Sequence, residues 1–261
     1  MLPFANPVAL AQSQRGLRMS GDSWTEEKNL NRQFPGNSNG ILAERIAHTI
    51  FSYFKKAHVD LVVDLHTMHT RSIHMAILDR IPTRKETFDT ALNHANKTGL
   101  PVVYDYPLES YAKESLDGSL SATFMNAGIP SFTIEVPGGP FSQHKAEQTI
   151  YMALGNLHEK LGLTLPETEK KFAHSFVFSK LELGCLRYAR MRGPIANRAG
   201  FFRPMVSIGE VEKDRIIGKI VDETSTTVET ITMPFDGYVS DIIDASVVTT
   251  GDMLFEFLVS K

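Results

Sequence analysis

The feature of this sequence that most constrains the fold is an alternation of apolar, β-branched runs with amphipathic stretches in the first part of the chain. Residues 59–67 (VDLVVDLHT) have the composition of a buried strand. Residues 37–57 begin with polar capping residues and predict a helix. The apolar side chains at helical spacing within that stretch are Ile41, Leu42, Ile46, Ile50 and Phe54. The alternation predicts an α/β sheet layered with helices.

The same pattern continues to about residue 162. Further strands are predicted at 75–80, 100–106 and 129–139, and further helices at 82–99, 118–128 and 142–162. The pattern then changes at the polar, proline-containing stretch 163–171 (LTLPETEKK), after which short β-rich runs are punctuated by glycine. We therefore expect an α/β domain at 1–169 and a small all-β domain at 170–261.

Composition narrows the classes of protein that this chain can belong to. Its 261 residues carry a net charge of -3, which gives no reason to expect a nucleic acid or a membrane surface as partner. The single cysteine, Cys185, excludes an intrachain disulfide and favours a cytoplasmic location. No apolar run is long enough to span a membrane, and the first ten residues lack the basic start of a signal peptide.

Two polar side chains follow predicted strands at their carboxyl ends, where open α/β sheets gather functional groups. His66 follows the strand at 59–65, and Glu135 lies near the end of the strand at 129–136. A neutral imidazole is a good zinc ligand, and a carboxylate beside a metal-bound water is a good general base. Asp64 leaves the strand on the same face as His66 and can orient its ring. The alternative is a hydrogen-bonded core or loop histidine and a surface carboxylate.

The loop at 29–37 (NLNRQFPGN) places an amide and a guanidinium side by side at Asn31 and Arg32. Arginine can hold a carboxylate with two parallel hydrogen bonds. Arg15 lies upstream in another loop-like stretch. The alternative is that Arg32 is a solvated loop residue before a Pro-Gly turn.

Taken in order, FANP (4–7), Arg15, NLNRQFPG (29–36), VVDLHT (62–67) and TIEVPGG (133–139) resemble the succinylglutamate desuccinylase/aspartoacylase family of zinc carboxypeptidase-like hydrolases. The segments GFFRPMV (200–206), MPFDGYV (233–239) and TTGDMLFEF (249–257) resemble the small barrel-sandwich domain of that family. The resemblance implies a mixed sheet with helices on both faces, followed by that β domain. It also implies a small-molecule substrate that carries a carboxylate.

The resemblance implies a role for each matching residue. His66 matches a zinc ligand, and Glu135 matches the general base that activates the zinc-bound water. Arg15 matches the residue that polarises the scissile carbonyl, and Asn31 and Arg32 match the pair that holds the carboxylate of the substrate. The implied reaction is hydrolysis of the amide bond of an N-acyl amino acid, with zinc as the cofactor.

The family takes its first two zinc ligands from a His-x-x-Glu motif upstream of the segment that matches FANP, and this chain begins only a few residues before Asn6. We interpret the sequence as an N-terminally truncated member of the family. Two alternatives stay open, namely a short protein that holds zinc poorly and a site that a second chain completes, for instance in a homo-oligomer. One His-x-x-Glu does occur, at His144 and Glu147 in a predicted helix, but this position does not match the family motif.

Smaller departures concern three side chains. Asn29 stands where the family usually has an aspartate, which puts the positioning of Arg32 in question. His69 and His74 follow His66 closely and are interpreted as loop histidines, with a supporting role near a metal as the alternative.

Two functions from other classes compete with the hydrolase. The β domain also resembles a biotinyl or lipoyl carrier, but no lysine lies between Lys219 and Lys261 to hold a prosthetic group, so this function is rejected. A metal-free, inactive fragment or carboxylate-binding protein, built on Arg15, Asn31 and Arg32, stays open.

Overall fold

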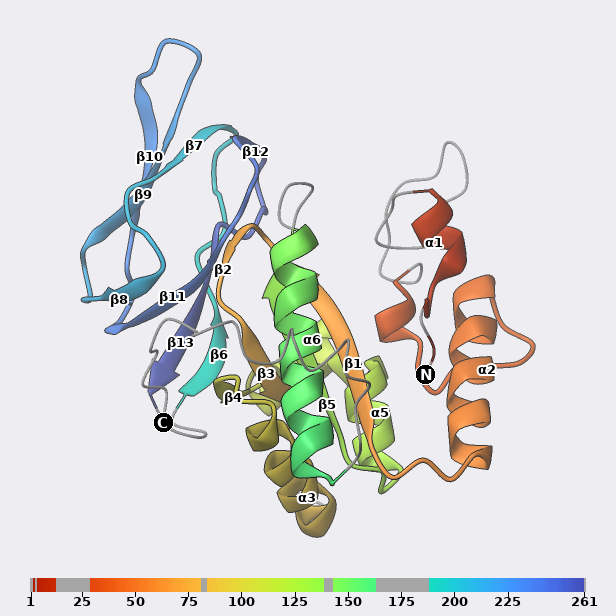
Figure 1. Ribbon diagram of the computed structural model, residues 1–261. Helices are drawn as coiled ribbons and strands as arrows, with labels where there is room; N and C mark the ends of the chain where they lie inside the picture. The colour runs from red at the N-terminus through yellow and green to blue at the C-terminus, as the bar shows by residue number, and fades with distance from the viewer. Residues whose placement is uncertain are drawn as a thin grey trace. The chain divides into compact units, whose positions relative to one another are not determined.

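The computed structural model describes residue 2 and residues 4–12, 29–80, 84–138, 143–162 and 188–260 (Figure 1). Its helices are α1 (Pro7–Ala11), η2 (Leu30–Arg32), α2 (Leu42–Lys56), α3 (Lys85–Lys97), α4 (Leu108–Glu114), η3 (Leu116–Gly118), α5 (Leu120–Asn126) and α6 (Gln143–Lys160). The strands of the first part are β1 (Val62–Met68), β2 (Arg71–Ser72), β3 (Met75–Leu78), β4 (Val102–Tyr104) and β5 (Ser131–Pro137). Those of the second part are β6 (Tyr188–Arg192), β7 (Gly200–Pro204), β8 (Gly209–Val211), β9 (Ile216–Val221), β10 (Thr227–Thr232), β11 (Gly237–Ile242), β12 (Val247–Val248) and β13 (Phe255–Ser260).

The described strands form two sheets. The larger runs in the order β1-β5-β3-β4-β6-β13-β11-β2, and β8 pairs with β11. It is mixed, because β4 is parallel to both β3 and β6 whereas β5 is antiparallel to β3. The smaller sheet has the order β10-β9-β7-β12. The predicted mixed α/β architecture is confirmed.

Burial explains why β3 is a continuous apolar run. All four residues of β3 are buried, as are the first six of β5. A strand that is covered on both faces has no polar face to alternate with. In β5, by contrast, the polar residues Ser131, Thr133 and Glu135 alternate with apolar ones although all six are buried, so Glu135 is a buried carboxyl group that the rule does not explain.

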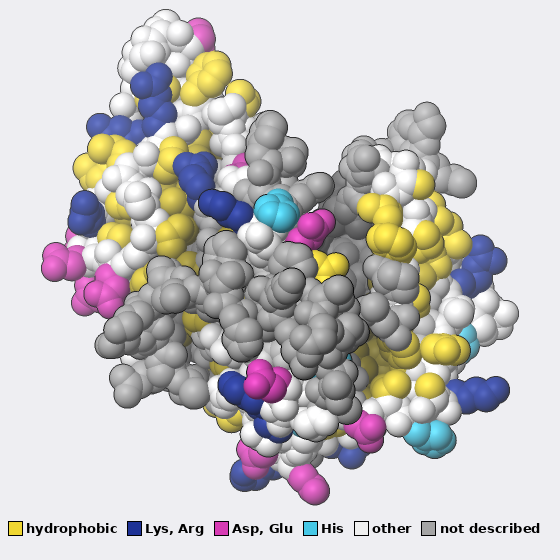
Figure 2. Space-filling model, in the orientation of Figure 1, with side chains coloured by type: hydrophobic (Ala, Val, Ile, Leu, Met, Phe, Trp, Pro, Cys, Tyr) yellow, Lys and Arg dark blue, Asp and Glu magenta, His cyan; other side chains and the backbone are white. Residues whose placement is uncertain are grey.

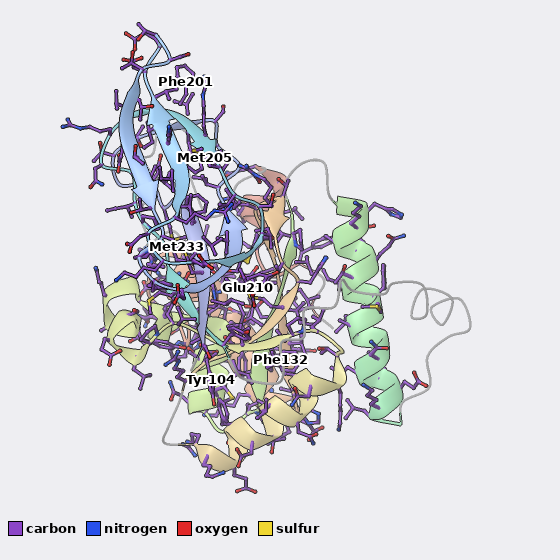
Figure 3. The ribbon with its side chains drawn as sticks, turned by 90° about the vertical axis from the view of Figure 1, so that its left-hand side faces the viewer. Tyr104, Phe132, Phe201, Met205, Glu210 and Met233 are labelled. Atoms are coloured by element: carbon purple, nitrogen blue, oxygen red, sulfur yellow. The ribbon has the colours of Figure 1, made fainter. Side chains whose placement is uncertain are left out.

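The β-rich part contributes to both sheets. The run at 228–243 divides at the turn 233–236 into β10, in the smaller sheet, and β11, in the larger one. Its core includes Phe202, Ile220, Met233, Phe255 and Phe257. Figure 3 shows Phe201, Met205 and Met233 among these strands. Met233 is fully buried, whereas Phe201 and Met205 are exposed.

Contacts divide the chain into two compact units that do not follow chain order. Unit 1 comprises residues 1–64, 79–91 and 108–132, and unit 2 comprises residues 65–78, 92–107 and 133–261. The strands β1 and β5 each pass from one unit to the other. The predicted domain boundary near residue 169 lies outside the described residues and stays a prediction.

Unit 1 has its own core, to which α2, α5 and the loop at 30–34 contribute. Of the apolar residues at helical spacing, Ile50 is buried and Ile46 and Phe54 pack partly buried against this core, whereas Leu42 and the N-cap residue Ile41 are exposed. Small side chains, Ala43 and Ala47, are buried instead. Figure 2 shows hydrophobic side chains gathered at the surface over α1 and α2.

None of the helices in the described ranges is long and apolar enough to cross a membrane.

Candidate functional site

Neighbouring strands of the larger sheet bring the two central candidate residues together. His66 is the fifth residue of β1, and Glu135 is the fifth residue of β5. The His66 Nδ1 and Glu135 Oε1 atoms lie 3.6 Å apart. The side chain of His66 is 20% exposed and that of Glu135 is 11% exposed. A carboxylate and an imidazole thus meet in a largely desolvated position, although they are 69 positions apart in sequence.

The distance and the burial define what this pair can do chemically. At 3.6 Å the two atoms are close enough for ionic attraction but too far apart for a good direct hydrogen bond. A buried carboxylate beside an imidazole suits a proton acceptor, because low polarity strengthens every charge interaction at the site. The arrangement agrees with the roles of ligand and base that the sequence predicts, and those roles stay predictions.

Gly138, the residue after β5, packs closely against the end of β1. The Gly138 N–H donates to the Met68 carbonyl at 3.0 Å. A Cβ added at Gly138 would lie 2.4 Å from the Thr67 Cβ and 2.7 Å from the Met68 carbonyl oxygen. Only glycine allows this close contact. The first glycine of VPGG is therefore explained by the fit of Gly138 against the residues that follow His66.

The loop that carries Asn31 and Arg32 is braced from within unit 1. The Asn29 side chain accepts from the Asn31 N–H at 3.2 Å and caps the short helix η2. The Asn31 Oδ1 atom accepts from the Leu120 N–H at 2.7 Å, at the start of α5. The departure at Asn29 therefore supplies a neutral capping oxygen, which satisfies a backbone donor without adding charge beside Arg32.

Arg32 contributes to the same local network. Its Nη1 donates to the Asn31 carbonyl at 2.7 Å. A Cβ at Gly118 would lie 2.3 Å from the Arg32 carbonyl oxygen, and the Gly118 carbonyl accepts from the Phe34 N–H at 3.0 Å. The backbone around Asn31 and Arg32 is thus closely packed against the segment that precedes α5.

The structure says less about the other residues singled out in the sequence. Asp64 precedes His66 by two positions on β1 and so leaves the strand on the same side. Arg15 lies outside the described residues. His144 and Glu147 lie on α6, and His144 contacts Gln148 through a bond of 3.0 Å between side-chain nitrogens.

The imidazole of His66 fits a zinc ligand, whereas the carboxylate of Glu135 beside it fits a base that acts on a metal-bound water rather than a second ligand. A catalytic zinc takes three protein ligands. Among the residues that the structure describes, no group of three or more His, Cys, Asp or Glu side chains is placed to hold a metal ion.

The structure also reveals a pair that the sequence did not predict. The His69 Nδ1 lies 2.6 Å from Asp241 Oδ2, on β11. This hydrogen bond raises the pKa of His69 above 6.5, against the opposing effect of burial. Burial also raises the pKa of Asp241. The partners are 172 residues apart, so no local sequence signal could have found them.

His74 differs from His69 in its surroundings. Burial lowers its pKa from 6.5 to about 4, so the ring is neutral near pH 7. Both histidines lie outside helices and strands, as the loop interpretation expects.

Comparison with known proteins agrees with this fold. Solved structures with the same fold include a succinylglutamate desuccinylase/aspartoacylase from Rhodobacter sphaeroides, at TM-score 0.73 and 20% identity over 100% of this chain and 74% of that one. An aspartoacylase family protein from Mesorhizobium loti has a TM-score of 0.72 and 20% identity, over 99% of this chain and 73% of that one. The product-bound ectoine utilization protein EutE (DoeB) from Ruegeria pomeroyi has a TM-score of 0.78 and 19% identity, over 100% of this chain and 74% of that one. No curated protein sequence matches the chain.

The decisive match is to a family model. Residues 1–158, more than half of the chain, match the succinylglutamate desuccinylase/aspartoacylase catalytic domain. That range includes His66, Glu135, Asn31 and Arg32. The chain therefore belongs to the succinylglutamate desuccinylase/aspartoacylase family of hydrolases.

Proposed function

We propose that this protein is a metal-dependent hydrolase that cleaves the amide bond of an N-acyl amino acid or a similar small substrate. The observation that carries the proposal is the approach of His66 to Glu135, at 3.6 Å, in a chain of this family. The zinc carboxypeptidase-like arrangement, with helices on both faces of the sheet and a barrel-sandwich C-terminal domain, belongs to the same proposal.

Each residue has a defined task in the proposed reaction. Glu135 accepts a proton from the attacking water and returns it to the leaving amine, so that the C–N bond breaks to give a carboxylate and an amine. His66 would hold a zinc ion, which lowers the pKa of water and stabilises negative charge when bound. Asp64 would orient the ring of His66.

Recognition of the substrate is assigned to cationic and amide groups. Arg32 would bind the carboxylate of the substrate, and Arg15 would stabilise the charge that develops on the carbonyl oxygen. The Asn31 Oδ1 atom is engaged by Leu120, so this residue would contact the substrate through its NH2 group. Support for these roles comes from the family match over residues 1–158 and from the braced loop.

A metal-free carboxylate-binding protein is the second candidate. It is favoured by the loop at Asn29–Arg32, which holds an amide and a guanidinium in a fixed local geometry without any metal. Such a protein would bind N-acyl amino acids without turning them over.

The proposal is tested by measuring amine release from a panel of N-acyl amino acids, with the purified chain and one equivalent of zinc. We expect turnover that a chelator abolishes and that Glu135→Gln lowers about 100-fold to 10,000-fold. Substrate binding, measured by calorimetry, should survive this substitution because the amide keeps the shape of the side chain.

The matched control is Glu159→Gln, the same exchange at an exposed position of α6, which should leave turnover unchanged. Binding without turnover in the wild-type chain would favour the carboxylate-binding protein. Full activity in Glu135→Gln would exclude Glu135 as the base.

A further inference from the structure

We propose that the His69–Asp241 pair is a positioning device for the His66–Glu135 centre, which ties the segment 66–75 to strand β11. The inference rests on the proposed function for its catalytic consequence, while the tie itself can be measured without any substrate.

The first argument is the path of the segment. At one end, His66 lies 3.6 Å from Glu135. At the other end, Met75 pairs directly with Glu135 in the register of β3 and β5. The segment therefore leaves the side of Glu135 and returns to it, so that anything that holds its middle also holds the surroundings of this carboxylate.

The second argument is the number of bonds that hold this middle. Beside the His69–Asp241 bond of 2.6 Å, Thr70 donates to Asp244 from both its backbone N–H and its hydroxyl. The Arg71 guanidinium donates to the Ile243 carbonyl at 2.5 Å. The backbone completes the match, since β2 pairs with β11. Consecutive residues 69–72 are thus bonded to consecutive residues 241–244.

The third argument is that the tie continues to the turn after Glu135. The His69 carbonyl accepts from the Ser72 hydroxyl at 2.8 Å and from the Gly138 N–H at 3.4 Å. His69 is therefore held at its side chain by β11 and at its backbone by Gly138, the residue after β5. A displacement of His69 would be transmitted to both sides of the proposed centre.

The fourth argument is that stability alone does not explain Asp241. Its side chain is 3% exposed, and its Oδ1 atom has no hydrogen-bond partner among the described residues. Burial of an ionised carboxylate costs free energy unless specific partners compensate. A buried charge that makes one hydrogen bond, to a half-buried histidine beside the proposed centre, is better explained by positioning than by stability.

The bond is strongest while the ring is protonated. The charged groups that affect the pKa of His69 are the carboxylates of Asp241, Asp244 and Glu256. The positively charged Arg190 affects Asp241 and lowers the pKa of its carboxyl group. Three carboxylates favour the imidazolium form, so the pKa of His69 lies above its ordinary value. We expect the tie to be tightest below that pKa and weaker above it.

Hydrogen exchange of backbone amides in residues 66–75, followed by mass spectrometry, tests the tie in the full chain. In His69→Ala we expect exchange about tenfold faster near pH 6, which is the effect of losing a charge-assisted hydrogen bond. His69→Asn places an amide donor at the position of Nδ1 but cannot titrate. It should keep the protection and remove its decline as pH rises above 6.5.

The matched control is His158→Ala, which removes a histidine whose Nδ1 bonds to the Leu154 carbonyl on α6. It should leave exchange in residues 66–75 unchanged. Unchanged exchange in His69→Ala as well would overturn the inference.

The pH profile of kcat adds a measurement that a purely structural role of His69 would leave unchanged. With an active wild-type chain, His69→Ala should lower kcat with little change in KM, and His69→Asn should restore kcat while removing the alkaline limb of the pH profile. Faster exchange in His69→Ala together with no hydrolysis by the wild-type chain would support the tie and overturn the proposed hydrolase. Wild-type kcat and pH profile in His69→Ala would overturn the positioning role and leave the hydrolase intact.

Discussion

Asn29 shows how a single side chain can replace a charge without losing a structural role. The family resemblance raised a question about substrate positioning because a carboxylate is absent there. In the structure the Asn29 amide oxygen accepts from the Asn31 N–H, and the residue is buried. An acceptor oxygen is what a helix start needs, and asparagine provides it as well as aspartate does.

This role predicts the effect of two substitutions at Asn29. Asn29→Ala removes the capping acceptor and should lower the free energy of unfolding by about 1 kcal/mol. Asn29→Ser keeps a short capping acceptor without adding a buried charge and should lose clearly less stability than Asn29→Ala. Urea denaturation measures both. Equal stability of Asn29→Ala and the wild type would show that the cap contributes nothing.

At the scale of elements, two glycines pack closely against the segments that carry His66 and Arg32. Gly138 lies against Thr67 and Met68 at the end of β1, and Gly118 lies against Arg32 at the end of η2. In both places the glycine is needed because a side chain would overlap a neighbouring backbone. The motifs that carry the family resemblance thus have a packing reason as well as a chemical one.

The contact at Gly138 gives the second prediction. Gly138→Ala introduces a Cβ within 2.4 Å of the Thr67 Cβ, so the turn must shift. We expect a loss of about 2–3 kcal/mol in unfolding free energy and, if the proposed function is correct, a lower kcat.

Gly162→Ala is the comparison for this variant, since no heavy atom lies within 4 Å of the added group there, although its φ is +73°. It should cost only the backbone strain of about 1 kcal/mol and leave kcat unchanged. Identical stability losses for the two variants would exclude steric overlap as the cause at Gly138.

At the scale of the whole molecule, a buried ionic network joins the β-rich part to β4 within unit 2. Arg190 on β6 bonds to Glu256 on β13 and to Asp105 just after β4. Tyr106 stacks under the guanidinium at 4.5 Å and donates to Glu256. Burial raises the pKa of Tyr106, which keeps its hydroxyl protonated as a donor.

Breaking this network gives the third prediction. Arg190→Met leaves the carboxylates of Glu256 and Asp105 buried without their cation, and should cost about 3–5 kcal/mol of unfolding free energy. Lys85→Met is the control: it removes an exposed pair with Asp89 on α3 and should cost less than about 1 kcal/mol. Chemical denaturation of both variants at one pH separates the two cases.

The fourth prediction concerns pH. His69 and His74 should change the unfolding free energy with pH in opposite directions, because their pKa values shift in opposite directions. The pKa of His69 is raised above 6.5, so its stabilisation is fully present below about pH 6.5 and is lost as pH rises through the higher folded value. The pKa of His74 falls to about 4, so its contribution is present above about pH 6.5 and is lost as pH falls toward 4.

Unfolding free energies measured across this range should therefore show a loss on the alkaline side that His69→Asn removes. His74→Phe, which cannot be protonated, should remove part of the loss on the acid side. A wild-type alkaline loss retained in His69→Asn would contradict the assignment.

The sequence by itself determined the order and type of most elements, because apolar periodicity and turn residues act locally. The helices closed by Gly99 and Gly128, the strand that carries His66 and the β-rich last third all appear where they were predicted. The motifs also identified the family, because short segments in a fixed order keep their meaning without coordinates.

Only the tertiary structure decided which distant residues meet. It placed Glu135 beside His66, paired His69 with Asp241, and put β6, β11 and β13 in one sheet with β3 and β4. It also left Ile41 and Leu42, at the start of α2, exposed, and buried Ile50 of the same apolar series. These outcomes depend on strand order and on packing between segments far apart in the chain, and no local pattern encodes the energy of those contacts.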